Sequence, residues 1–278
     1  MLITTKGMLG EKPASVRPRR VIVHSYMRSG STLCGDILQA SPDVFYIYEP
    51  LLYLFDHNVP GKPVFTKHNL RCKESGTIVQ KVLRLTMKET VEYLERDPDV
   101  LVIHLVRDPR GVYLSRKQYQ PPNVPEMHVN YSNLCQRVWN DLHASMSMPA
   151  KYKGRVLTMR YEDLAENLQA MTTTMYRFLG LELSQSVLKF LSSTSQREII
   201  AANGRPEVSS TKRKDPFKTA YKWRKELPFD VVKDIDHHCR DIYRALGYKT
   251  FKSETDLRNL QIPPKTKNFG QGLLIAKA

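Results

Sequence analysis

The segment VIVHSYMRSGSTLCGDIL, residues 21–38, gives the clearest indication of the fold. Its first six residues are mostly apolar and β-branched, which predicts a buried strand. Small and polar residues follow at 28–32, and residues 31–40 then have the composition of a helix that ends before Ser41-Pro42. A strand, a tight turn and a helix in this order form the loops that bind phosphate groups through backbone amides.

This loop differs from the phosphate-binding loop of nucleoside triphosphatases. That loop reads G-x-x-x-x-G-K-[ST] and places a hydroxyl on Mg²⁺. Here the lysine is missing, Arg28 stands in the loop, and no later strand ends in a Walker B aspartate. The sequence therefore favours a bound phosphate group and disfavours a nucleotide kinase. Taken alone, RSGST at 28–32 also fits an ordinary helix N-terminus after a buried strand.

A second segment, DVLVIHLVRDPRGVYLSRK at 99–117, repeats the arrangement. Its apolar run, residues 100–106, predicts a strand with Arg107 at its end, and Pro109 suits the first turn of a helix. Asp108 is expected either to cap that helix or to pair with an arginine. Arg107 and Ser115 together are predicted to hold a second phosphate group.

The remaining chain alternates between strand-like and helix-like segments. Strands are expected at 44–50, 77–85 and 154–160, helices at 88–96, 132–148, 168–179, 184–192 and 228–245, and loops at 120–132 and 203–222. The alternation predicts an α/β protein with a P-loop-like three-layer fold, in which helices flank a central parallel sheet. Ligands of such sheets bind at the carboxyl ends of the strands, so Arg28 and Arg107 are expected to line one crevice. We expect a basic leader at 1–19, one domain at 20–250 and a C-terminal tail at 251–278.

The composition limits the kinds of partner. The 278 residues carry a formal net charge of +15, which favours anionic partners such as nucleic acid, acidic membranes, glycans or a nucleotide. No nucleic-acid reader motif accompanies this charge, so we expect no nucleic acid. No apolar run reaches the roughly 18 residues of a membrane span. The four cysteines form no C-x-x-C pair, which argues against zinc and leaves either buried thiols or one or two disulfides.

Taken in order, the motifs resemble a known family. They are RSGST (28–32), SPDVFYIYEPL (41–51), VRDPRGVYLSR (106–116), RYEDLAEN (160–167), YKWRKELPF (221–229) and CRDIYRALGY (239–248). The set is similar to the carbohydrate sulfotransferases that modify N-acetylglucosamine, galactose and chondroitin. The resemblance implies 3′-phosphoadenosine 5′-phosphosulfate as cosubstrate and no metal. It also implies in-line transfer of a sulfuryl group to the hydroxyl of a carbohydrate acceptor, with an anionic glycan among the acceptors considered.

The resemblance also implies which residues hold the cosubstrate. The 5′-phosphosulfate falls on Arg28, Ser29, Gly30, Ser31, Thr32 and Leu33. The 3′-phosphate falls on Arg107 and Ser115 with their neighbours Asp108, Pro109, Arg110, Gly111, Val112 and Arg116. Tyr161 is expected either to contact adenine or to be a core tyrosine. Lys212 and Arg213 are candidates to close over the 3′-phosphate or are solvated surface residues.

The reaction requires a base and a group that stabilises charge on the leaving phosphate. Arg28 is the candidate for the second task. Glu49 is the candidate base, because it is expected to end the strand beside the loop and resembles the family's proposed base; otherwise it is a helix cap or an ion-pair partner. His68 is the rival base, and His24 is expected to be a satisfied core histidine.

The chain also departs from the family's pattern. Members are usually Golgi proteins with an N-terminal anchor, whereas the N-terminus here lacks the apolar core of a signal peptide. Thr32-Leu33 replaces the commoner Ser-Phe pair, and Asn130-Tyr131-Ser132 is a glycosylation sequon that is used only in the lumen. The resemblance implies the Golgi lumen. Protein tyrosines and small phenols or alcohols remain alternative acceptors.

Overall fold

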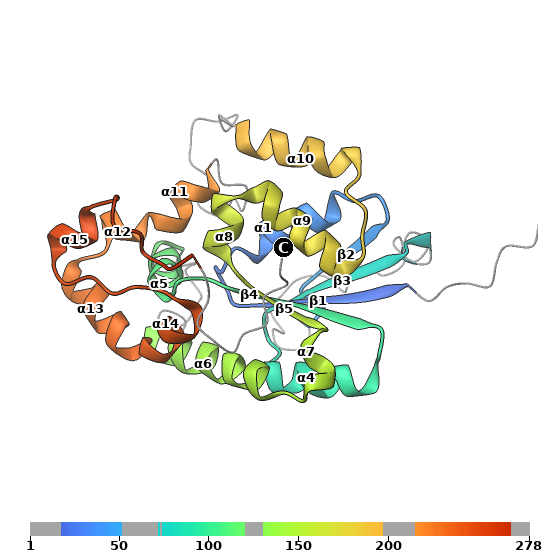
Figure 1. Ribbon diagram of the computed structural model, residues 1–278, viewed down its shortest axis with the longest axis horizontal. Coiled ribbons are helices and arrows are strands. Elements are labelled where there is room, and N and C mark those ends of the chain that lie inside the picture. The colour runs from blue at the N-terminus through green and yellow to red at the C-terminus, as the bar shows by residue number, and fades with distance from the viewer. Residues whose placement is uncertain (1–17, 52–71, 73, 120–129, 197–214, 268–278) are drawn as a thin grey trace, which may run out of the picture.

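The computed structural model describes residues 18–51, 72, 74–119, 130–196 and 215–267. Their centre is a five-stranded sheet with the order β2-β3-β1-β4-β5 (Figure 1). Its strands are β1 (Arg19–Ser25), β2 (Val44–Tyr48), β3 (Thr77–Val82), β4 (Val100–Val106) and β5 (Val156–Arg160). Every neighbouring pair is parallel, so the carboxyl ends of all five strands lie at the same end of the sheet.

The central strands are apolar along most of their length because both faces of the sheet are covered. In register, Val23 lies beside Ile103 and His24 beside His104, and all four side chains are buried. Parallel sheets covered on both faces characteristically contain such continuous apolar strands. The edge strand β2 is less buried, and the side chain of Tyr48 at its end is 53% exposed.

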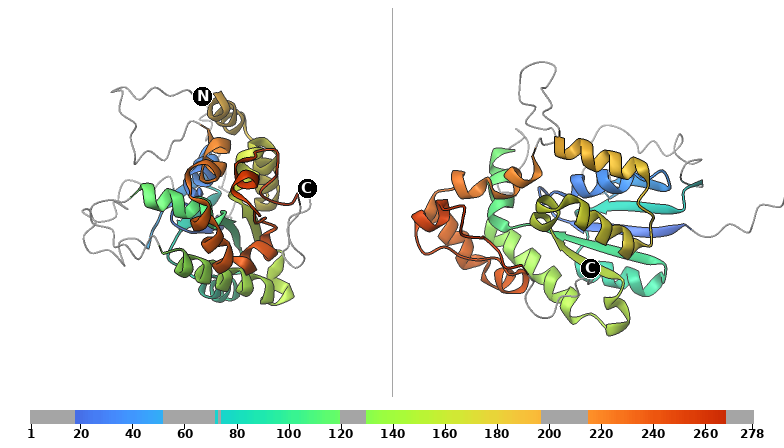
Figure 2. Two further views of the ribbon diagram at one scale, coloured as in Figure 1. Left: turned by 90° about the vertical axis from the view of Figure 1, so that its left-hand side faces the viewer. Right: turned by 45° about the horizontal axis from the view of Figure 1, so that its top comes forward.

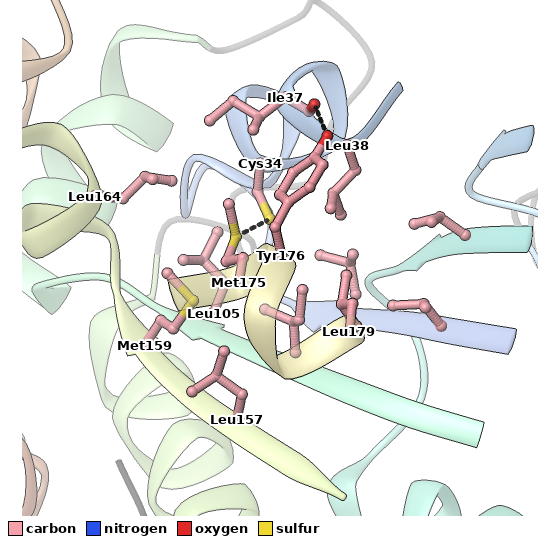
Figure 3. Packing of buried hydrophobic residues seen from close by; sticks show 14 of the residues in the cluster. Cys34, Ile37, Leu38, Leu105, Leu157, Met159, Leu164, Met175, Tyr176 and Leu179 are labelled. Carbon is pink, nitrogen blue, oxygen red and sulfur yellow. Dashed lines mark hydrogen bonds between the residues drawn. The ribbon is translucent and has the colours of Figure 1, made fainter. Parts of the chain in front are cut away.

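One face of the sheet is covered by α1 (Ser31–Gln39), α8 (Tyr161–Glu166), α9 (Leu168–Leu179) and α10 (Gln185–Gln196) (Figures 1 and 3). Residues from these helices and the strands form one apolar cluster. Within it, the Tyr176 hydroxyl donates a 2.8 Å hydrogen bond to the carbonyl oxygen of Ile37, and Cys34 Sγ lies 3.7 Å from Met175 Sδ. These contacts tie α9 to α1, the helix that follows the first loop.

The other face packs against α4 (Met87–Arg96), α6 (Tyr131–Ser147) and α7 (Ala150–Lys153). The cluster there includes Ile22, Met87 and Tyr152. Thr86 and Glu89 form a capping box at the start of α4, in which each side chain bonds the other residue's backbone amide.

A group of helices lies beyond the carboxyl ends of the strands (Figures 1 and 2). It consists of α5 (Pro109–Gln118), α11 (Pro216–Tyr221), α12 (Trp223–Glu226), α13 (Phe229–His238), α14 (Arg240–Leu246) and α15 (Glu254–Arg258). Tyr26 and Val106, at the ends of β1 and β4, belong to the same apolar cluster as Trp223. A disulfide joins Cys135 of α6 to Cys239, with 5.1 Å between their Cα atoms.

These observations confirm the predicted α/β class and the parallel sheet between helical layers. Two expectations were wrong. The helix expected at 228–245 is interrupted at Cys239, the disulfide residue, and part of the loop expected at 203–222 forms α11. The segment after residue 250 contains α15, whose Leu257 is buried. Within the described part of the chain, no helix is both long and apolar enough to cross a membrane.

Candidate active site

The loop after β1, residues 26–30, presents backbone amides at the carboxyl end of the sheet. Ser29 closes the turn inwardly, because its amide donates to the Tyr26 carbonyl oxygen (3.0 Å) and its Oγ accepts from the Tyr26 amide (3.3 Å). Gly30 caps α1 without any side-chain cap. The first-turn amides of Ser31, Thr32 and Leu33 have no acceptor inside the helix, so this helix start is suited to an anion.

Two left-handed residues shape this loop. Arg28 has φ 70° and Gly30 has φ 90°. A Cβ atom on Gly30 would lie 2.1 Å from Cδ2 of Tyr161, so the loop backbone packs directly on that ring. Only glycine satisfies both the backbone angle and the lack of space.

The turn after β4, residues 107–109, contacts the β1 loop directly. Arg107 donates a 3.1 Å hydrogen bond to the carbonyl oxygen of Arg28, and Arg28 Nε donates to Ser115 Oγ at 3.1 Å. Arg116 Nε donates to the carbonyl oxygen of Met27 at 3.2 Å. The expectation that both strand ends meet at one place is therefore confirmed.

Arg107 keeps unused hydrogen-bonding capacity. Its guanidinium has five N–H groups; besides the bond to Arg28, it donates to the carbonyl oxygen of Thr219 at 2.7 Å. Nε is buried and has no partner among the described residues. Because buried donors are rarely left unpaired, this atom is a candidate ligand contact, and a cation beside an open helix start fits an anionic ligand.

Arg110, three residues later, has the opposite environment. It is fully buried, and its side-chain nitrogens donate to both oxygens of Asp108, to Asp236 and to the Lys249 carbonyl oxygen at 2.8 to 3.1 Å. Its guanidinium also stacks 4.0 Å from the centre of the Trp223 ring. The neighbouring carboxylates raise the pKa of Arg110 against the effect of burial.

The structure encloses part of the predicted binding set. The side chains of Arg110 and Val112 belong to the interior, and Val112 is only 2% exposed. Asp108 does both things that were considered for it, since it caps α5 through the Arg110 amide and pairs with the Arg110 guanidinium. Pro109 occupies the first turn as expected. Gly111 leaves room for Arg107, whose Nε would lie 3.1 Å from a Cβ atom there.

Glu49 directly follows β2, as expected, and strand β3 lies between β2 and β1 in the sheet. Its carboxylate is buried and pairs with Lys81 Nζ (3.3 Å) and with Arg84. Glu49 also has φ 41°, an uncommon angle for a residue with a side chain.

Lys81 is a buried cation beside Glu49 that the sequence analysis did not single out. It lies near the end of β3, is 1% exposed, and places its ammonium 3.5 Å from the centre of the Tyr48 ring. Burial lowers the pKa of Lys81, while Glu49 opposes that shift. Burial, followed by Glu49, raises the pKa of Tyr48 to about 12, and the charge of Arg28 lowers it. The available signal was a lysine within the strand TIVQKV, residues 77–82.

A buried polar network lies against the end of β1. His24 Nε2 lies 3.3 Å from Asp141 Oδ2, and its Nδ1 lies 3.3 Å from Thr90 Oγ1, which confirms the expected core histidine. The Tyr26 hydroxyl donates to the same Asp141 oxygen and lies 2.9 Å from His104 Nε2. Burial, together with His24, lowers the pKa of His104 to about 3, so this ring is neutral at ordinary pH.

The other predicted residues divide into two groups. Tyr161 is 4% exposed, with Arg107 stacked 4.7 Å from its ring centre, so it lies in the core directly beneath both loops. His68, Lys212 and Arg213 lie outside the described residues. Across the described ranges, no group of three His, Cys, Asp or Glu side chains forms a candidate metal site.

Comparison with known proteins identifies the family. A family model described as "Sulfotransferase domain" matches residues 18–253. The chain belongs to this family. The chain is 28% identical to human carbohydrate sulfotransferase 1 over 209 residues, or 68% of this chain and 49% of the relative. It is 23% identical to mouse carbohydrate sulfotransferase 4 over 345 residues, covering 91% of this chain and 88% of the relative.

The chain spans about half of the length of several of these relatives, including the first. Among solved structures it resembles mouse sulfotransferase SULT7A1 complexed with PAP, with a TM-score of 0.53 and 16% identity over 83% of this chain and 86% of that one. It also resembles the sulfotransferase domain of the Synechococcus PCC 7002 olefin synthase, with a TM-score of 0.54 and 18% identity over 87% and 99%. These likenesses confirm the sulfotransferase fold.

Proposed function

We propose that this sulfotransferase transfers the sulfuryl group of 3′-phosphoadenosine 5′-phosphosulfate to a carbohydrate hydroxyl by in-line displacement. The observation that carries the proposal is the contact between two strand ends, each equipped for an anion: the β1 loop with its open amides and Arg107 with its unpaired Nε. A single polyphosphate needs one such place. A nucleotide with phosphate groups at two separate positions needs both.

The residues fit this cosubstrate in a simple division. In this proposal, the amides of Ser31, Thr32 and Leu33, with the Arg28 side chain, bind the 5′-phosphosulfate. Arg107, Ser115 and Arg116 bind the 3′-phosphate. Arg110 and Val112 have no direct role in this division, because their side chains are enclosed.

The cosubstrate supplies an activated sulfuryl group with the 5′-phosphate as leaving group, and the protein supplies charge stabilisation and orientation. The loop amides and Arg28 offer fixed donors where negative charge grows on the leaving oxygen. Glu49 is the candidate to accept the proton of the acceptor hydroxyl. Since its carboxylate is held by Lys81 and Arg84, these two cations fix its orientation.

Three findings support a carbohydrate acceptor in the Golgi lumen. The curated relatives are named carbohydrate sulfotransferases. The disulfide between Cys135 and Cys239 fits an oxidising compartment. Asn130, the sequon residue, is exposed at the start of α6, where its side chain accepts from the Asn133 amide. The net charge of +15 favours an anionic glycan among carbohydrates.

The first test measures the binding of adenosine 3′,5′-bisphosphate by calorimetry. AMP and ATP are titrated in the same way for comparison. We expect the bisphosphate to bind most tightly. Equal binding of all three nucleotides would contradict the two-anion site.

The second test measures sulfuryl transfer from labelled cosubstrate to N-acetylglucosamine, galactose and chondroitin acceptors, beside a tyrosine peptide and a simple phenol. We expect product only with sugars. Product with the tyrosine peptide or the phenol would keep the sulfotransferase activity and replace the acceptor class.

A further inference from the structure

The RYED motif contains a buried carboxylate that has no part in the proposed reaction. Glu162, the second residue of α8, is fully buried. Its Oε1 accepts a 3.1 Å hydrogen bond from the Asp108 amide, and its Oε2 accepts a 2.7 Å hydrogen bond from the Tyr248 hydroxyl. Glu162 therefore connects the turn that immediately follows Arg107 to the C-terminal part of the fold.

The residue before it serves the same junction. The Tyr161 ring is packed against Gly30 of the β1 loop and against the guanidinium of Arg107. Residues 161 and 162 thus touch both strand ends, Tyr161 through its ring and Glu162 through the backbone of the β4 turn. This short segment sets the position of one anion-binding group relative to the other.

We propose that Glu162 is a positioning residue for the 3′-phosphate site, an inference that rests on the proposed function. Glu162 takes up a proton from solvent when a phosphate group binds beside Arg107. The buffer supplies this proton, and the buried carboxylate of Glu162 accepts it.

The charged and titratable groups around Glu162 support this coupling. Asp108 faces it from the β4 turn, Arg107 from the end of β4, Arg160 from β5, Tyr248 from the segment after α14 and Tyr221 from α11. Burial, and then the charge of Asp108, raises the pKa of Glu162 to about 7, whereas Arg107 lowers it.

A bound phosphate acts on this balance in one direction. It adds negative charge near the carboxylate and offsets the positive charge of Arg107, and both changes favour the protonated carboxyl. By linkage, binding that takes up a proton becomes weaker as pH rises, by at most about tenfold per pH unit for one proton. The 3′-phosphate itself acts in the opposite sense, because it must lose its own proton to become the dianion.

The experiment is calorimetric titration with adenosine 3′,5′-bisphosphate at pH 7.5 in two buffers that differ in ionisation enthalpy. The difference between the buffers gives the number of protons taken up on binding. We expect the wild-type protein to take up more protons than Glu162→Gln, by up to about three quarters of a proton, because a carboxyl with a pKa of about 7 is already partly protonated at pH 7.5. Between pH 7 and 8, its affinity should fall more steeply than that of the variant, by up to about tenfold per unit.

Three controls separate this effect from a general loss of structure. Glu166→Gln removes a half-exposed carboxylate from the same helix and should leave proton uptake at the wild-type value. AMP lacks the 3′-phosphate, so its binding should be accompanied by the same proton uptake in the wild type and in Glu162→Gln. Tyr248→Phe keeps the carboxylate but removes a hydrogen bond that favours its ionised form, so uptake at pH 7.5 should be smaller than in the wild type.

The outcomes distinguish the two proposals. If the wild type binds the bisphosphate and takes up the same number of protons as Glu162→Gln, the role of Glu162 is overturned and the proposed function stands. If the wild type does not prefer the bisphosphate to AMP, the proposed function itself is overturned. Should Glu162→Gln fail to fold, unchanged uptake in Tyr248→Phe would overturn the inference.

Discussion

Arg107 and Arg110 follow the same strand, are three residues apart and are both buried, but they differ in how their donors are used. Arg107 bridges to the β1 loop through one backbone carbonyl and has a buried Nε without a partner in the described structure. Arg110 points into the C-terminal helices, where two carboxylates, a carbonyl oxygen and an aromatic ring use its whole guanidinium. One arginine keeps a buried donor without a partner in the described structure, and the donors of the other are used by the protein.

The difference teaches how a basic motif should be interpreted. A charge at a strand end predicts anion binding only if the fold leaves some of its donors unpaired. In the β4 turn, Asp108 pairs with Arg110, whereas Arg107 has no carboxylate ion-pair partner among the described residues. The comparison can be tested at both arginines, at Gly30 and at His104.

Replacing Arg110 should affect stability most. Arg110→Ala leaves Asp108 and Asp236 as buried carboxylates without their cation, which typically costs about 3–5 kcal/mol of unfolding free energy. Urea denaturation measures this loss. The exposed pair of Arg244 and Asp241 provides the control, where Arg244→Ala should cost about 0–1 kcal/mol. A stable Arg110→Ala protein that has lost bisphosphate binding would reverse the roles assigned to the two arginines.

Replacing Gly30 should damage the β1 loop. In Gly30→Ala, the left-handed angle costs about 1–2 kcal/mol, and the methyl group would also overlap the Tyr161 ring. We expect calorimetry to show weaker binding of both AMP and the bisphosphate, since both carry the 5′-phosphate. Gly154→Ala is the matched control, because a Cβ atom there meets nothing within 4 Å. Unchanged AMP binding in Gly30→Ala would remove the loop from the proposed site.

Replacing Arg107 should change selectivity more than stability. Arg107→Lys keeps the charge but loses the planar set of donors, and charged hydrogen bonds contribute about 1.5–3 kcal/mol. The bisphosphate should therefore bind roughly 10- to 100-fold more weakly, with AMP binding unchanged. Parallel titrations with the two nucleotides measure the effect. An equal loss for both would show that Arg107 does not bind the 3′-phosphate.

Replacing the neutral His104 should give the smallest effect, which is a change in how the unfolding free energy depends on pH. Its folded pKa of about 3 lies below the unfolded value, so the unfolded chain binds more protons and stability falls as pH drops from about 6.5 towards 3. The contribution is at most about 1.4 kcal/mol per pH unit. Denaturation at several pH values should show a shallower dependence in His104→Gln than in His143→Gln, which changes an exposed histidine. Equal slopes would mean that His104 is not held neutral.

Much of this arrangement could be predicted from local sequence. The apolar runs at 21–26 and 100–106 and the turns after them indicated a parallel sheet with two basic strand ends at one edge, and the contact of Arg107 with Arg28 agrees. Each of these signals lies within a short stretch of chain, where periodicity and turn residues carry the information.

The remaining features depend on contacts between distant segments. The strand order decides that β3 separates Glu49 from the β1 loop, and no local pattern gives that order. Arg110 could not be recognised as enclosed without Asp236, 126 residues away. Lys81 appeared to be one polar residue in a core strand, because its partner Glu49 lies on the neighbouring strand.

The disulfide between Cys135 and Cys239 closes a covalent ring around a large part of the candidate site. The two cysteines are 104 residues apart in sequence, and the enclosed chain contains β5, Tyr161, Glu162 and Thr219. A protease that cuts once inside this ring therefore releases no fragment until the bond is reduced. The two halves migrate together on a non-reducing gel and separate only after thiol treatment, so apparent resistance to digestion must be judged under reducing conditions.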